Sequence, residues 1–224
     1  MRIEPAGARH VPGIAAIYAH AARTSAATFD LDGLPEEAWH RTLAEVDPDA
    51  GRLLLVALDD AGEVLGYSKS GEHKSRPAYA STCETSVYLA EHARRRRVGG
   101  ALYDALLERL DESPLRLAVG GVAEPNEGST RLHLSRGYER VGTFTGIGVK
   151  YAREWDVTWY QRRLATPRLV RELEGLVARG GGYGEGMAIV EARERPRGGT
   201  GERLILEWCA EVLAPVRPRD AGAA

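Results

Sequence analysis

The sequence predicts a mixed α/β fold, in which one central sheet carries helices on both of its faces. The chain has 224 residues, 43% hydrophobic and 28% charged, so it can bury a substantial core. Apolar residues recur at helical spacing in some segments and form short continuous runs in others. These two kinds of segment alternate over residues 1–164, which is the pattern of a layered α/β domain.

The first half of the chain predicts one strand and two helices that lead into a hairpin. In order, the elements are a strand at 2–5, a helix from residue 11, a loop at 24–35, a helix at 36–46, and paired strands at 52–59 and 63–70. The first helix is predicted because Val11, Ile14 and Ile17 share one helical face. The second helix ends at Asp47-Pro48, since the residue before a proline avoids the helical conformation.

The second half of the domain predicts strands and helices in alternation. They are a strand at 86–90, a helix at 100–110, a strand at 115–122, a helix at 127–135, and strands around 137–142 and 156–161. The complete order is therefore β-α-α-β-β-β-α-β-α-β-β. After Leu164 glycines become frequent, and residues 165–224 are interpreted as a C-terminal extension with two amphipathic helices of unknown role.

Composition excludes several classes of protein. The 30 Lys and Arg residues against 32 Asp and Glu residues argue against a nucleic-acid binder, which needs excess positive charge. No apolar run reaches the roughly 18–20 residues of a membrane span, and the start of the chain does not resemble a signal peptide. Cys83 and Cys209 lie far apart, and the histidines show no ligand spacing. We therefore expect a cytoplasmic protein without a metal site, a membrane partner or a nucleic-acid partner.

One segment carries most of the chemical information, ETSVYLAEHARRRRVGGALYDALL at 84–107. It predicts a strand, a short basic loop and a helix that begins near Gly99-Gly100. Backbone N–H groups at a helix start are unpaired, and the helix dipole there favours negative charge. The segment is therefore suited to a pyrophosphate. By itself, the run of four arginines fits a solvated surface equally well.

This segment resembles the acetyl-CoA-binding motif of the GNAT acetyltransferases, and more narrowly that of the phosphinothricin and methionine sulfoximine N-acetyltransferases. The resemblance extends to RPAY at 76–79, PNEGSTRLHLSRGYERVGTF at 125–144, GIGVKYAREWDVTWYQRRL at 146–164 and IYAHAARTSAATF at 17–29. Together these stretches cover residues 2–164 in the family's order. The resemblance implies the GNAT fold, a mixed and mostly antiparallel sheet, and family members often form homodimers.

The pyrophosphate loop departs from the family pattern, which is Gln/Arg-x-x-Gly-x-Gly/Ala. An alignment without gaps starts at Arg94 and places Arg97 where the central glycine is expected. A shift to Arg96 would satisfy the pattern, but only with a gap, so we prefer the ungapped alignment. Glycine allows close backbone approach to phosphate, whereas arginine adds charge and bulk. The resemblance implies that the loop residues Arg94, Arg95, Arg96, Arg97, Val98, Gly99 and Gly100 bind the cofactor.

The resemblance also implies catalytic roles in a direct transfer, in which an amine attacks the thioester without an acyl-enzyme. Glu84 matches the proposed base, which removes a proton from the acceptor's ammonium group. His133 matches an assisting histidine, and Tyr103 lies on the right helix to protonate the departing sulfur. The alternatives are a surface carboxylate, a packed histidine and a core tyrosine. Cys83 is interpreted as a small buried residue.

Further residues match binding positions of the family. The backbone of Val87, Tyr88 and Leu89 matches the strand that pairs with the pantetheine arm, and the N–H near Leu89 is placed to stabilise the oxyanion. Asn126 matches a cofactor contact, and the alternative role, the N-cap of the next helix, is compatible with it. Three residues match the acceptor pocket, namely Phe29, Arg76 and Tyr79. An arginine pairs well with a carboxylate or a phosphinate.

The main hypothesis is an acetyl-CoA-dependent N-acetyltransferase that acts on the α-amine of a small acidic amino acid, a reaction associated with herbicide or antibiotic resistance. One alternative keeps the fold but changes the amine, because residues 72–74 and 81–83 give the pocket an altered sequence. Another alternative is a non-catalytic module that binds CoA or a protein partner, with its phosphate loop disabled by Arg97.

Overall fold

The computed structural model describes residues 1–165, and the two helices expected in the C-terminal extension lie outside the described residues. The predicted order of helices and strands is confirmed. The elements are β1 (Arg2–Pro5), α1 (Val11–Thr24), α2 (Glu36–Ala44), β2 (Leu54–Leu58), β3 (Val64–Glu72), β4 (Thr82–Leu89), α3 (Val98–Asp111), β5 (Leu117–Ala123), α4 (Glu127–Leu134), β6 (Glu139–Lys150) and β7 (Arg153–Arg163). Within residues 1–165, no helix is both long and apolar enough to cross a membrane.

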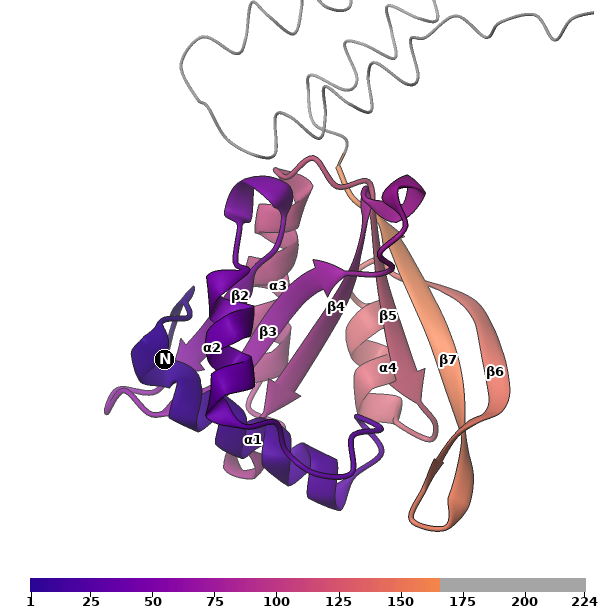
Figure 1. Cartoon of the computed structure of the whole chain (residues 1–224), viewed down its shortest axis with the longest axis horizontal. Coiled ribbons are helices and arrows are strands. Elements are labelled where there is room, and N and C mark those ends of the chain that lie inside the picture. Colours follow the sequence, from indigo (N-terminus) through magenta and orange to yellow (C-terminus); the bar gives the residue numbers. More distant parts are fainter. Residues whose placement is uncertain (166–224) are drawn as a thin grey trace, which may run out of the picture.

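The described strands form a sheet of seven in the order β1-β2-β3-β4-β5-β7-β6. All neighbours are antiparallel except β4 and β5, which are parallel and pair over only three positions, the last of them Glu84 opposite Val119. Beyond that pair the two strands diverge and leave a V-shaped gap (Figure 1). The prediction of a mixed, mostly antiparallel sheet is confirmed, and the point where β4 and β5 separate is called the vertex below.

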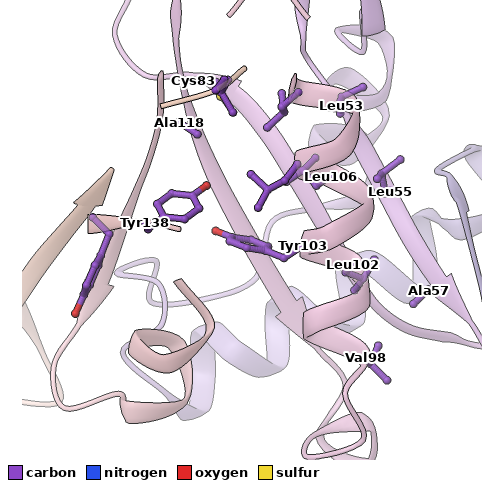
Figure 2. Close-up of a cluster of buried hydrophobic side chains, with 14 of the residues drawn as sticks. Leu53, Leu55, Ala57, Cys83, Val98, Leu102, Tyr103, Leu106, Ala118 and Tyr138 are labelled. Atoms are coloured by element: carbon purple, nitrogen blue, oxygen red, sulfur yellow. The ribbon is translucent and has the colours of Figure 1, made fainter. Parts of the chain in front are cut away.

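Helices cover both faces of this sheet, as predicted (Figure 1). On one face, α3 presents Val98, Leu102 and Leu106 to the sheet, because residues four apart lie on the same side of a helix (Figure 2). On the other face, α1 and α2 enclose a second cluster that contains Trp39 and Tyr67. The sheet therefore separates two cores, and a residue on β4 faces one or the other according to its position along the strand.

Several element boundaries differ from the predictions. The strand expected at 86–90 already begins at Thr82, because Thr82 pairs with β5 and the residues from Cys83 onward pair with β3. The helix expected from residue 100 begins at Val98. The last two strands are much longer than expected and form a hairpin over Glu139–Lys150 and Arg153–Arg163. Their length comes from pairing with each other, which local sequence patterns do not show.

Candidate functional site

Glu84 lies at the vertex, in the last parallel pair between β4 and β5. Its neighbours Cys83 and Thr85 are buried on the α3 side of the sheet. Since side chains alternate along a strand, Glu84 points to the opposite face, which carries α1 and α2. Its side chain is 46% exposed. The vertex therefore presents a carboxylate that solvent and a small molecule can both reach.

Three ring side chains meet beside Glu84. His73 follows the end of β3, and its Nδ1 lies 3.5 Å from Glu84 Oε2. The His73 ring packs edge-on against Tyr79 and Trp159, with ring centres 6.0 and 5.8 Å away. The fold thus brings the predicted residues Glu84 and Tyr79 together through His73. Arg76 starts the same short turn as Tyr79 and is exposed.

Sequence reasoning gave neither His73 nor Trp159 a role. His73 entered only as part of an altered pocket sequence, and Trp159 only as part of a family motif. The two residues are 86 positions apart, on a turn and on β7, and only the sheet brings them together. A histidine in a loop and a tryptophan in a strand carry no local signal for such a contact.

A lysine shares this face of the sheet with Glu84. Lys69 on β3 pairs with Ser86 on β4, and its Nζ lies 5.9 Å from the ring centre of Trp39. Burial lowers the pKa of Lys69, while the nearby Glu84 carboxylate acts in the opposite direction. Lys69 also lines a cavity of about 730 Å³ between the end of α2 and the start of β4. A cation therefore lies near the predicted base, and the sequence alone did not indicate it.

A buried network of polar groups lies on the opposite side of β4. The Thr85 hydroxyl lies 3.1 Å from the Tyr103 hydroxyl and 2.8 Å from that of Tyr138. The Tyr103 hydroxyl also lies 3.0 Å from His133 Nε2. Figure 2 shows Tyr103 and Tyr138 with their hydroxyl groups turned toward each other. These four residues thus join α3, α4, β4 and the segment that leads into β6.

The protonation of this network follows from its partners. His133 Nδ1 lies 2.8 Å from the Ser129 carbonyl, which only accepts, so the neutral ring carries its proton at Nδ1. Nε2 then accepts from Tyr103. Burial lowers the pKa of His133 and raises that of Tyr103 well above its usual value, so both are uncharged at neutral pH. His133 and Glu84 lie on opposite sides of β4, so the fold does not bring these two predicted residues into contact.

Asn126 and Gly120 both lie against α4. The Asn126 side chain caps α4 by accepting a hydrogen bond from the Ser129 N–H at 3.1 Å, as the compatible alternative predicted. A Cβ on Gly120 of β5 would lie 2.6 Å from His133 Nε2. Only glycine therefore leaves room for the imidazole at this position.

The basic loop has an unusual backbone. Arg97 is the N-cap of α3, with φ 63° and ψ 5°, and Arg95 has φ 61°. Side chains other than glycine avoid this left-handed region. Arg97 therefore has the conformation that the family's central glycine would adopt with ease, which supports the ungapped alignment. All four arginines of the loop are exposed, whereas Val98 and Gly99 are buried.

The loop between α1 and α2 is fixed to the β6–β7 hairpin. Lys150 is 3% exposed, and its Nζ donates to three backbone carbonyls, those of Ser25, Thr28 and Asp30, at 2.8, 2.8 and 2.7 Å. The Phe29 ring lies directly over Gly148, where a Cβ would be 2.4 Å from it. The predicted pocket residue Phe29 is thus held in place from β6. A lysine near a hairpin end looks like a surface residue in the sequence, so Lys150 was missed.

Comparison with known proteins places the chain in one class, the acetyltransferases. A family model described as "Acetyltransferase (GNAT) domain" matches residues 11–159. The chain belongs to this GNAT family, and it is an acyltransferase. Among the described residues, no group of three or more His, Cys, Asp or Glu side chains is placed to hold a metal ion.

Individual relatives narrow the resemblance. The chain is 36% identical over 165 residues to a phosphinothricin N-acetyltransferase from Streptomyces coelicolor, covering 73% of this chain and 96% of the relative. It is 34% identical over 169 residues to an L-methionine sulfoximine/L-methionine sulfone acetyltransferase from Pseudomonas aeruginosa, covering 74% and 96%. A crystal structure of a phosphinothricin acetyltransferase from Sinorhizobium meliloti in complex with acetyl-CoA superposes with a TM-score of 0.70 at 27% identity, covering 75% of this chain and 90% of the other.

Proposed function

We propose that this protein transfers the acetyl group of acetyl-CoA to the α-amine of a small acidic amino acid of the phosphinothricin or methionine sulfoximine kind. The observation that carries the proposal is the position of Glu84, a solvent-accessible carboxylate at the vertex of the sheet. The names of the relatives supply the class of acceptor. Bound acetyl-CoA supplies an acetyl group on a thioester, which a neutral amine attacks directly.

The gap beyond the vertex has the polar groups that this donor requires. No pairing joins β4 and β5 beyond Glu84 and Val119, so the backbone groups of Val87, Tyr88 and Leu89 that point away from β3 are available to amide groups of a pantetheine arm. Ser86 Oγ is buried there without a hydrogen-bond partner among the described residues. The cofactor-binding role of residues 94–100 and Asn126 is part of the proposal, and the exposed guanidinium groups suit phosphate.

Glu84 takes a proton from the acceptor in this proposal. An amino acid's amine is protonated at neutral pH and cannot attack until it loses a proton. The exposure of Glu84 lets it contact the acceptor and return the proton to solvent. Cys83 offers no competing covalent route, because burial raises the pKa of its thiol to about 12 and the residue packs into the core. These properties favour direct transfer.

The remaining predicted residues keep their roles as proposals. Arg76 offers a cation to the acceptor's second acidic group, and Lys69 adds another on the same face. Tyr103 keeps its proton at neutral pH, as a donor to a leaving group requires, although His133 and Thr85 already engage its hydroxyl. In this proposal Tyr79 and Phe29 form walls of the pocket.

We also infer a homodimer. β6 is the edge strand of the sheet and carries exposed apolar side chains, namely Val141, Phe144, Ile147 and Val149. An exposed apolar edge strand is prone to pair with another chain. Sedimentation equilibrium measures this association directly. The unpaired thiol of Cys83 and the need for acetyl-CoA fit a cytoplasmic enzyme.

The test is acetyl transfer by the purified chain to a panel of amines. CoA release is measured with phosphinothricin, methionine sulfoximine, other amino acids and simple amines. Glu84→Gln is expected to lower kcat by about 10²- to 10⁴-fold, the usual contribution of a general base, without changing the Kd of acetyl-CoA. Glu63→Gln, at an exposed carboxylate in the turn before β3, is the matched control and retains activity.

Two outcomes contradict parts of this proposal. CoA release only with a non-acidic amine would overturn the assignment of the acceptor. An active Glu84→Gln variant would overturn the role of the base.

A further inference from the structure

His73 is placed to act on the proposed base. It follows directly after β3, whose last pair joins Glu72 to Cys83, the neighbour of Glu84. From there its Nδ1 faces Glu84 Oε2 at 3.5 Å. This contact directs Oε2 toward the imidazole, so Oε1 can face a second partner.

The orientation of the His73 ring is set by two aromatic neighbours. The planes of Tyr79 and Trp159 cross the imidazole at 73° and 74°, with centroids 6.0 and 5.8 Å away. Tyr79 belongs to a short turn and Trp159 to β7, so separate elements enclose the ring. The His73 side chain is only 17% exposed. Its nitrogen is thus aimed at Glu84 by packing and not by chance contact in solvent.

Nδ1 of His73 is otherwise unused. It is buried and has no hydrogen-bond partner among the described residues, because 3.5 Å to Glu84 is too long for a good hydrogen bond. Buried polar atoms without partners are rare in folded proteins and often belong to functional groups. A small movement of the Glu84 carboxyl closes the gap.

We propose that His73 is a positioning residue whose Nδ1–H donates to Glu84 Oε2 and leaves Oε1 to face the acceptor. This inference rests on the proposed function. The N–H bond of the acceptor ammonium breaks and an O–H bond forms at Oε1 of Glu84. That O–H bond then breaks and its proton passes to water. Glu84 is again a carboxylate, and His73 keeps its own proton throughout.

Imidazole suits this task because its neutral ring carries one N–H donor, which can lie at Nδ1. Contact at Oε2 also limits rotation of the carboxyl group. Oε1 then faces the acceptor in a constant direction. Both effects raise the rate of the chemical step and leave the binding of acetyl-CoA alone.

The experiment compares His73→Phe and His73→Asn with the wild type in the full chain. Phenylalanine keeps a ring between Tyr79 and Trp159 without a nitrogen, and asparagine keeps an N–H donor near the position of Nδ1. We expect kcat to fall about tenfold or more in His73→Phe and to be largely retained in His73→Asn, with the KM of acetyl-CoA unchanged in both. His40→Phe, at an exposed position of α2, is the matched control and retains wild-type kcat.

A double-mutant cycle separates a role through Glu84 from a general structural effect. If His73 acts through Glu84, then Glu84→Gln with His73→Phe is no slower than Glu84→Gln alone, because the interaction is already lost. Additive losses, or a His73→Phe kcat within twofold of wild type, would overturn the inference. Either of these results would overturn the role of His73 without affecting the proposed function. The proposed function is overturned by a different result, namely that the wild-type protein releases no CoA with any acceptor.

Discussion

Replacing Arg97 by glycine tests whether the basic loop is held in a strained backbone conformation. Arg97 caps α3 with φ 63° and ψ 5°, in the left-handed region. That region costs a side chain other than glycine about 1–2 kcal/mol. Glycine avoids this cost but loses more chain entropy on folding, by roughly 0.5–1 kcal/mol. Arg97→Gly is therefore expected to raise the free energy of unfolding by about 0.5–1 kcal/mol.

Arg94→Gly provides the matched control. Arg94 is also exposed and lies in the same loop, but its φ of −64° and ψ of 150° are ordinary for any residue. Its replacement removes the same charge without relieving strain, so stability falls by roughly 0.5–1 kcal/mol. The free energies of unfolding of the two variants thus differ by about 1–2 kcal/mol, which is the cost of the left-handed conformation.

Urea unfolding of the two variants measures this difference through the transition midpoints, provided that the slopes agree. A rise in Tm of about 1–4 °C for Arg97→Gly is the thermal equivalent for a chain of this size. If both variants lose stability equally, the argument from backbone strain is wrong. Calorimetry on the same proteins gives the Kd of acetyl-CoA. We expect Arg97→Gly to change it less than tenfold, because the left-handed residue already gives the loop a glycine-like backbone.

Two further predictions concern stability. Lys150→Met removes an ammonium that donates to three carbonyls of the α1–α2 loop, and we expect the free energy of unfolding in urea to fall by about 3 kcal/mol, together with a higher KM for the acceptor. Lys74→Met, at an exposed position where the ammonium lies 5.1 Å from the Tyr79 ring centre, lowers stability by at most about 1 kcal/mol, and an equal loss in both variants would contradict the reasoning. His133 has a lowered pKa in the folded state, so the unfolded chain binds its proton first as the pH falls. The stability that neutral His133 contributes is fully present above about pH 6.5 and is lost as the pH falls toward the lower pKa of the folded state. We expect His133→Gln to lack this part of the pH dependence of the free energy of unfolding. Identical pH profiles for the two proteins would show that the burial of His133 is not the cause.

The order of helices and strands was predictable because it depends on local patterns. The apolar faces of α1 and α3, and the short apolar run of β2, are visible in any window of about a dozen residues. The predicted strand boundaries were wrong where pairing between strands overrides the local β-propensity of the sequence. β4 begins four residues early, and β6 continues to Lys150, because neighbouring strands satisfy their backbone groups.

The candidate site was predictable only as far as family motifs name residues. Glu84, Tyr103, His133 and Asn126 came from such motifs, and the structure adds their surroundings. It places Glu84 on one side of β4 and His133 on the other. No motif indicates this separation, since it depends on which face of the sheet each neighbouring residue occupies.

By itself, the sequence determined the class of fold, the family and the motif that contains the predicted base, because periodicity and motifs are properties of contiguous residues. Tertiary structure decided the rest. His73 meets Glu84 because β3 and β4 pair, and it meets Trp159 because β7 lies beyond β5 in the same sheet. Lys150 finds its carbonyl partners 120 to 125 residues earlier in the chain. Contacts between residues so far apart in the chain form only when the strands assemble into the sheet, and no local sequence pattern predicts them.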